Sequence, residues 1–333
     1  MTVRIISAGK TDVGHVRSAN EDTFKIDDER NLFLVCDGMG GHQAGEVASH
    51  EACNVISYCI SELRSELATD SVLALPARFP SSGDLLVKAI RIANRSVYLK
   101  SRSRSDYTGM GTTVVGAILQ GDMVNIAHVG DSRAYRLLPD RLIPLTRDHS
   151  WVAELEESGK YTREEAAKLA NRNVITRALG IHETVEIDFR SDRMEKGDVY
   201  IFCSDGLCGY VEDEDIYSVA KESRNDVERL VTDLVQMAND RGGLDNVTVV
   251  AFRVEDVGKS DIPVVSPVTI PVEGDDLILR ENQIVESIVK LNQTAQKVIT
   301  RTGSEQQASK LPMLFLAIFI VAVLAVIYFF YLK

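Results

Sequence analysis

The stretch CDGMGGHQAGE, residues 36–46, directly follows the apolar run 32–35. It places Asp37 at the end of a buried strand, followed by three glycines in four residues and then by a histidine. A charged carboxylate at the mouth of a core costs free energy unless something neutralises it. Glycines allow the backbone to approach a bound group closely. The stretch therefore predicts a binding site for a charge-neutralising group at this strand end.

Further acidic residues occupy similar positions. Asp131 and Asp205 each follow an apolar run, Asp245 directly precedes one, and Glu21 and Asp22 form an acidic pair. One such aspartate alone is typical of a turn, but several together indicate a cluster. Clustered carboxylates repel unless cations lie between them, and oxygen ligands select Mg²⁺ or Mn²⁺ over zinc. Two such ions can bind a bridging water and neutralise a phosphoryl group under in-line attack.

Other features narrow the chemistry to removal of a phosphoryl group. Arg17 offers a planar fork suited to two phosphate oxygens. The sequence contains no glycine-rich loop with the lysine that binds nucleoside triphosphates. The five cysteines match no zinc spacing, which indicates small buried residues in a reducing compartment. A net charge of −12 over 333 residues argues against non-specific nucleic-acid binding, so we expect no nucleic-acid partner.

Residues 1–257 alternate strand and helix signals. Strand-like runs lie at 32–36, 112–119, 124–129, 199–203 and 247–254, and helical periodicity lies at 44–67, 84–102 and 225–239. Asp84 is expected to cap the second helix, and Thr162 and Glu165 form a capping box. Strands joined by hairpins, with helices on separate stretches, predict sheets covered by helical layers rather than a βαβ repeat.

The C-terminal part changes character after residue 257. Residues 258–274 are rich in proline and typical of a linker. Apolar residues then recur at heptad-like spacing: Leu277, Ile284, Ile288, Leu291, Ala295 and Val298. A dimeric coiled coil, a single amphipathic helix and a flexible stalk all remain open for 258–310. Residues 311–332 hold no charge and are long enough for one transmembrane helix.

Eight motifs occur in the order seen in the metal-dependent type 2C protein serine/threonine phosphatases. They are RSANEDTF, LFLVCDGMGGHQAGEVAS, GTTVVGAI, AHVGDSRAYRL, LTRDHS, ITRALG, VYIFCSDGL and DNVTVVAF. Over residues 8–254 the chain resembles the bacterial branch of this family. The resemblance implies an α+β fold, namely an αββα sandwich of two antiparallel sheets flanked by helices. The C-terminal transmembrane helix would be added to that sandwich.

The resemblance also implies a reaction and a set of ligands. Water that bridges two Mn²⁺ or Mg²⁺ ions would attack phosphoserine or phosphothreonine in proteins, without a phosphoenzyme. Asp37 would bridge both metals, the Gly38 carbonyl would bind one of them, and Asp205 and Asp245 would hold the other. Arg17 would bind the substrate phosphate.

Three further acidic residues and a flap complete the family pattern. Glu21 and Asp22 would act mostly through bound waters. Asp131 would share a third metal with Asp205, as in bacterial members. Residues 150–174 match a mobile flap that covers the site.

The sequence leaves the identity of the general acid open. Eukaryotic members have a histidine directly after the Asp-Gly pair, whereas this chain has Met39. His42 is the nearest histidine, and it could act as the acid or support the loop by hydrogen bonds. Water on the metals could protonate the leaving group instead.

Alternative functions use the same residues. A catalytically silent, membrane-tethered pseudophosphatase would have lost metal ligands, but all of them are present here. A phosphatase acting on small metabolites remains open. The expected partners are phosphorylated proteins and an opposing serine/threonine kinase, with a homodimer through the stalk left open. The expected location is the membrane, with the catalytic domain in the cytoplasm.

Overall fold

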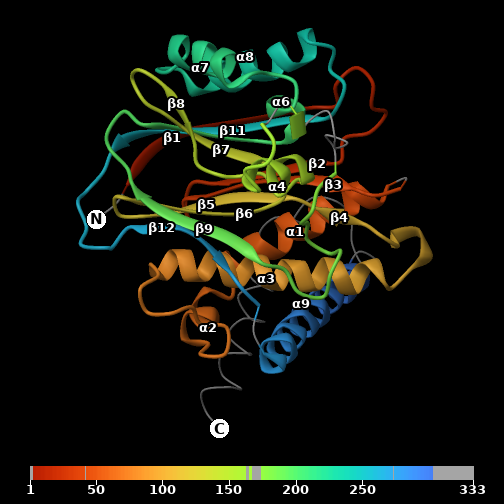
Figure 1. Ribbon diagram of the computed structural model, residues 1–333. Helices are drawn as coiled ribbons and strands as arrows, with labels where there is room; N and C mark the ends of the chain where they lie inside the picture. The colour runs from red at the N-terminus through yellow and green to blue at the C-terminus, as the bar shows by residue number, and fades with distance from the viewer. Residues whose placement is uncertain (1–2, 42, 163–164, 167–173, 273, 303–333) are drawn as a thin grey trace. The chain divides into compact units, whose positions relative to one another are not determined.

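The computed structural model describes residues 3–302 apart from 42, 163–164, 167–173 and 273 (Figure 1). The chain divides into two compact units, Met1–Val285 and Glu286–Lys333. The first unit contains both sheets and every predicted site residue that the structure describes.

Two antiparallel sheets form the centre of the first unit. One has the strand order β1-β11-β10-β7-β8, and the other has the order β12-β9-β6-β5-β3-β2, with β4 paired to β3. The strands are β1 Arg4–Asp12, β2 Asp22–Asp27, β3 Leu32–Met39, β4 Gly111–Thr112, β5 Val114–Gln120, β6 Met123–Val129, β7 Arg133–Leu137, β8 Leu142–Pro144, β9 Ile187–Arg193, β10 Val199–Cys203, β11 Val247–Asp256 and β12 Val265–Ile270.

Helices cover the outer face of each sheet. The helices are α1 Ala44–Ser61, α2 Arg64–Thr69, α3 Ser81–Ser101, α4 Trp151–Glu157, α6 Asp205–Cys208, α7 Asp213–Glu222, α8 Val227–Asp240 and α9 Asp275–Thr302, with a short 3₁₀ helix at Ser105–Tyr107. Helices α7 and α8 lie over the five-stranded sheet, and α1 and α3 lie over the seven-stranded sheet (Figure 1). The predicted αββα layering is confirmed.

Aromatic side chains fill the space between the two sheets. The Phe33 ring on β3 lies 4.6 Å from the Phe252 ring on β11, and the Tyr200 ring on β10 lies 4.9 Å from the same ring. Because side chains alternate along a strand, Phe33 and Val35 face this core, and Asp37 follows on the same face. The strand pattern thus carries a carboxylate to one end of the layer between the sheets.

Some predicted helix ends differ from those observed. The helix predicted over 44–67 divides into α1 and α2. Helix α3 begins at Ser81, directly after Pro80, so Asp84 lies in its first turn instead of capping it. The Asp84 carboxylate accepts a hydrogen bond from the Leu75 N–H at 2.8 Å and pairs with Lys88 at 2.7 Å.

The segment after residue 257 is more ordered than its composition suggests. Residues 265–270 form β12, which pairs with β9 at the edge of the seven-stranded sheet. Helix α9 begins at Asp275 and contains the heptad-like positions. Among the described residues, no helix is long and apolar enough to cross a membrane. The predicted span 311–332 lies outside the described residues.

Candidate metal centre

The ends of several strands bring the predicted carboxylates together. Asp22 and Asp37 are directly opposite each other on the antiparallel strands β2 and β3. Asp205 begins α6, separated from the end of β10 by one residue, and its carboxylate is within hydrogen-bond reach of that of Asp37. Asp131 follows β6 by way of Gly130. Residues far apart in the sequence therefore form one acidic cluster at the end of the inter-sheet core.

The electrostatics of the cluster show how closely its members approach. Burial, followed by the charges of Asp22, Asp205 and Asp131, raises the pKa of Asp37 well above its usual value. Burial raises the pKa of Asp22 to about 7, against the hydrogen bonds from Thr248 and Ser204. Each of these carboxylates therefore resists ionisation unless positive charge lies nearby.

Two other members behave in the same way. Burial and the charge of Asp205 raise the pKa of Asp131 to about 8. Burial and the charge of Asp245 raise the pKa of Asp205. A cluster of carboxyls with raised pKa values is typical of a functional site rather than of a structural ion-pair network.

Unsatisfied oxygens indicate what the cluster is built to bind. Asp22 Oδ1 and Asp131 Oδ1 are buried and have no hydrogen-bond partner among the described residues. Buried carboxylate oxygens are nearly always paired with donors or with metal ions. The donor set is all oxygen, which suits hard divalent cations. The residues present therefore fit Mn²⁺ or Mg²⁺.

Neutral polar side chains hold the Asp22 carboxylate and the Asp37 backbone in place. Ser204 donates from Oγ to Asp22 Oδ2 at 2.8 Å and accepts from the Thr248 N–H at 3.0 Å. Thr113 Oγ1 accepts from the Asp37 N–H at 3.0 Å. Sequence reasoning missed Ser204 and Thr113. The alternation of β10 could have indicated Ser204, since it follows Tyr200 and Phe202 on the face toward the inter-sheet core.

Glu21 lies against the N-terminus of α1. The Gly45 amide donates a hydrogen bond to its carboxylate, while burial raises the pKa of that carboxylate. A Cβ on Gly45 would lie 2.6 Å from the Glu21 carboxyl carbon, so a larger residue there would displace the Glu21 carboxylate. A Cβ on Gly38 would lie 2.1 Å from the Gly45 carbonyl oxygen. The glycines after Asp37 thus permit close approach between β3 and α1.

Asn246 joins the two loops at the rim of the cluster. Its Oδ1 accepts from the Glu21 N–H at 2.8 Å, and its Nδ2 donates to the carbonyls of Val13 and Ala19 at 2.9 Å. The Asn246 N–H also donates to Asp245 Oδ1 at 2.9 Å. Asn246 therefore fixes the loop that carries Arg17 as well as the loop that carries Asp245.

Arg17 lies at the mouth of the cluster. Its Nη2 donates to Asp245 Oδ2 at 2.8 Å, and 51% of its side chain is exposed. The hydrogen bond with Asp245, and the charges of Glu21 and Asp205, raise the pKa of the guanidinium against its partial desolvation. The arginine is thus charged, accessible and next to the acidic residues, as binding of a substrate phosphate requires.

The candidate general acid is not located. His42 lies outside the described residues. Met39, which stands where eukaryotic relatives have a histidine, ends β3 and is partly buried. Whether His42 protonates the leaving group stays a prediction.

Comparison with known proteins identifies the family. The sequence model of the family described as Protein phosphatase 2C matches residues 14–249. The chain is 36% identical to the serine/threonine phosphatase stp of Listeria innocua over 243 aligned residues. The aligned region covers 72% of this chain and 92% of that protein. This chain therefore belongs to the protein phosphatase 2C family.

Further relatives agree with this assignment. The serine/threonine protein phosphatase PstP of Mycobacterium tuberculosis is 34% identical over 280 residues, which are 83% of this chain and 50% of that protein. The crystal structure of the PstP catalytic domain with two manganese ions is 33% identical, with a TM-score of 0.65 over 77% of this chain and 100% of that chain. The structure of Stp1 from Staphylococcus aureus is 32% identical, with a TM-score of 0.64 over 77% of this chain and 96% of that chain.

Proposed function

We propose that this chain hydrolyses phosphoserine and phosphothreonine in proteins at a centre of two Mn²⁺ or Mg²⁺ ions. The observation that carries the proposal is the buried carboxylate cluster, with raised pKa values and two unpartnered oxygens. The family assignment and the manganese-bound relative support the same chemistry.

The ligands follow from the cluster. Asp37, Asp205 and Asp245, with the Gly38 carbonyl, would hold the two ions, and Glu21 and Asp22 would act around them. The bound ions supply a Lewis acid that lowers the pKa of water and offsets the charge of the phosphoryl group. Asp131 would take part in binding a third ion.

Arg17 would bind and orient the phosphate. Its guanidinium is half exposed and can present two N–H groups to two phosphate oxygens. Because one of its nitrogens already donates to Asp245, the arginine is aligned with the cluster before the substrate arrives. Replacement by lysine keeps the charge but loses the fork, so we expect a higher KM for the phosphopeptide with a smaller change in kcat.

A test of Arg17 compares Arg17→Lys with Arg229→Lys, a matched change at an exposed arginine that pairs with Asp233 on the same helix, α8. Steady-state kinetics on a phosphothreonine peptide should show a rise in KM only for Arg17→Lys. Equal KM values for the two variants would remove Arg17 from the phosphate site.

A catalytically silent scaffold is the second candidate function. No described metal-ligand position departs from the pattern expected of an active centre, which weighs against it. A phosphatase acting on small phosphorylated metabolites is a third candidate. Comparing kcat/KM for a phosphothreonine peptide with kcat/KM for free phosphothreonine separates the two active alternatives.

We further propose that residues 311–332 anchor the chain in a membrane, with the catalytic unit on the cytoplasmic side. The support is an uncharged stretch between Lys310 and Lys333 that is long enough to cross a bilayer. Tethering would raise the local concentration of enzyme near membrane substrates and near an opposing serine/threonine kinase. A homodimer through α9 belongs to the same proposal.

Membrane fractionation tests the anchor. The full chain should pellet with membranes and resist extraction by alkaline carbonate, whereas a chain ending at residue 310 should stay in the supernatant. Equal distribution of the two chains would contradict the anchor. Cross-linking of the membrane-bound chain, compared with a chain ending at residue 285, would test the dimer.

A further inference from the structure

His149 fixes the residue that directly precedes Asp131. The Gly130 N–H donates to His149 Nδ1 at 3.0 Å, and the His149 N–H donates to the Gly130 carbonyl at 2.9 Å. Gly130 has a φ of +111°, and a Cβ there would lie 2.6 Å from the Thr113 side chain. The N–H and the carbonyl of Gly130, which has a positive φ, are therefore both hydrogen-bonded to His149.

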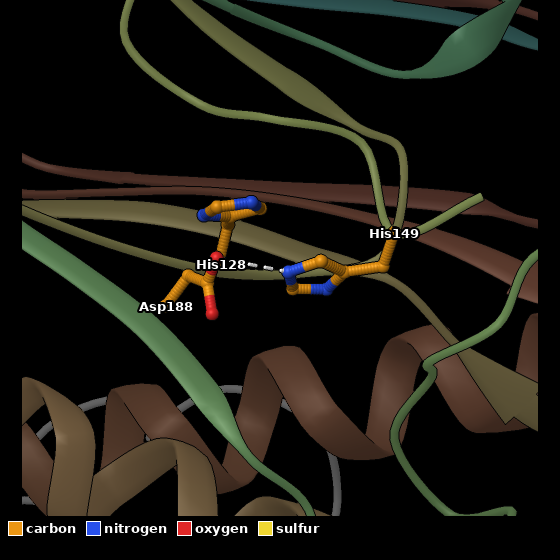
Figure 2. A group of neighbouring side chains, drawn as sticks. All are labelled: His128, His149 and Asp188. Atoms are coloured by element: carbon orange, nitrogen blue, oxygen red, sulfur yellow. Dashed lines mark ion pairs between the residues drawn. The ribbon is translucent and has the colours of Figure 1, made fainter. Parts of the chain in front are cut away.

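The bond from Gly130 determines the tautomer of His149. Because Nδ1 accepts a hydrogen bond, its lone pair is committed and the ring proton of the neutral histidine lies on Nε2. Nε2 faces Asp188 Oδ2 on β9 at 3.2 Å (Figure 2). Asp188 also accepts from Arg177 Nη1 at 3.0 Å and from Thr269 Oγ1 at 2.8 Å. The carboxylate thus holds the histidine with Nδ1 aimed at Gly130.

The same side chains are close enough to suggest a metal site, but the surroundings do not fit one. His128, His149 and Asp188 approach within reach of a shared ion. His149 Nδ1 is occupied, and His128 Nε2 lies 2.7 Å from the Arg147 carbonyl. The Arg177 guanidinium lies 3.1 Å from His149 Nε2 and 3.0 Å from Asp188, so positive charge already occupies the position of a cation. The cluster is therefore a hydrogen-bonded support.

The backbone of His149 extends this support to the neighbouring residues Trp151, Val174 and Thr176. The Thr176 N–H donates to the His149 carbonyl at 2.9 Å, and the Trp151 N–H donates to the Val174 carbonyl at 3.0 Å. Trp151 and Val174 are therefore hydrogen-bonded to each other beside His149.

We propose that His149 is a positioning residue: through Nδ1 it sets the Gly130–Asp131 backbone for binding of a divalent cation. The inference rests on the proposed function, because it takes Asp131 as a metal ligand. Asp131 Oδ1 is buried without a hydrogen-bond partner among the described residues, so no described donor orients that oxygen. Its direction therefore depends on the backbone that His149 fixes.

Two substitutions separate the roles of the two ring nitrogens. His149→Asn keeps an acceptor, Oδ1, near the place of Nδ1 and loses the donor toward Asp188. His149→Gln keeps a donor near the place of Nε2 and offers no acceptor to Gly130. His182→Gln, at an exposed histidine, is the matched control. The full-length chain would be titrated with Mn²⁺ by calorimetry, and hydrogen exchange of the Gly130 amide would be followed by mass spectrometry.

We expect His149→Gln to weaken the weakest Mn²⁺ site about 10-fold, since groups that orient ligands typically change metal affinity by about 10–100-fold. Exchange at Gly130 should accelerate in the same variant. His149→Asn and His182→Gln should stay within about 3-fold of the wild type, well below that range. Equal weakening by Asn and Gln, or no change with Gln, would overturn the inference. A wild-type chain that binds no Mn²⁺ would instead overturn the proposed function and this inference with it.

Discussion

The Asp37 carboxylate is expected to lower the stability of the metal-free chain and to be required for metal binding. Its carboxyl lies among Asp22, Asp131 and Asp205, and its raised pKa means that ionisation opposes folding unless cations are bound. Asn has nearly the same shape without the charge. The substitution should therefore relieve repulsion while removing a proposed metal ligand.

We accordingly predict that Asp37→Asn raises the stability of the metal-free chain, whereas most substitutions lower stability. In EDTA the variant should melt at least about 2 °C above the wild type, because 1 kcal/mol corresponds to roughly 2–4 °C in domains of comparable size. With Mn²⁺ the order should reverse, and phosphatase activity should fall by more than about 100-fold, beyond the loss typical of groups that only orient ligands. Differential scanning calorimetry measures the first effect and phosphate release the second. A variant less stable than the wild type in EDTA would contradict the repulsion argument.

The titration of Asp22 and Asp131 predicts a pH dependence. A carboxyl with a higher pKa in the folded chain than in the unfolded chain binds its proton more tightly when folded. Its contribution to stability is therefore complete below the unfolded value, near 3.9, and is lost as the pH rises through the folded value. The folded values are about 7 and about 8. In EDTA, stability should fall by about 2–3 kcal/mol between pH 6.5 and 8.5.

Urea unfolding at the two pH values, with EDTA or with Mn²⁺, measures this loss. Mn²⁺ should abolish most of it, since bound cations hold the carboxylates ionised. Burial also raises the pKa of Glu281 to about 7, outside the cluster, so Glu281→Gln is the control that removes that separate contribution. A stability that rises with pH in EDTA would be inconsistent with the cluster as described.

At the level of elements, β12 and the start of α9, residues 265–285, belong to the packing of the first unit. Leu277 and Ile284 on α9 are buried. Arg280 on the same helix pairs with Asp70 at 2.5 Å and with Glu66 at 2.9 Å, both at the helix α2 region. Strand β12 adds backbone hydrogen bonds at the sheet edge. The start of α9 is therefore part of the first unit.

A truncation pair tests this arrangement. A chain ending at 257 should be less stable than one ending at 285 by more than about 3 kcal/mol, since burial of each Leu or Ile contributes about 1.5–3 kcal/mol. Urea unfolding of both fragments in Mn²⁺ provides the comparison. Equal midpoints would show that β12 and α9 add nothing to the fold.

The element scale also shows where prediction from sequence succeeds. Alternating apolar residues and strong turn signals located β3, β5, β6, β10 and β11, because these strands are buried and their pattern is fixed by the core. Strand β12 was missed because Pro267 lies within it, and a proline is typical of linkers as well as of edge strands. Most of its residues are not buried, so no apolar alternation marks it. The long helix predicted over 44–67 was wrong in length, since α1 ends at Ser61 and α2 starts at Arg64.

The packing of the whole molecule determines which distant residues come together, and local sequence patterns do not show this. That Asp22, Asp37, Asp131 and Asp205 gather at one end follows from the pairing of two sheets, for which the family resemblance supplied the expectation. The neutral residues that orient them have no charge pattern to reveal them. The contacts of His149 are equally impossible to read from the local sequence, because they join it to a glycine 19 positions away and to Asp188 on a different strand.

Phosphate release from a phosphothreonine peptide by residues 1–285 tests the proposed phosphatase activity most directly. The measurement compares Mn²⁺ with EDTA and the wild type with Asp37→Asn. We expect release that requires Mn²⁺ and is lost in the variant, because the carboxylate cluster is inactive without cations between its members. A folded wild-type fragment that binds Mn²⁺ but releases no phosphate, or a variant that keeps full activity, would contradict the account.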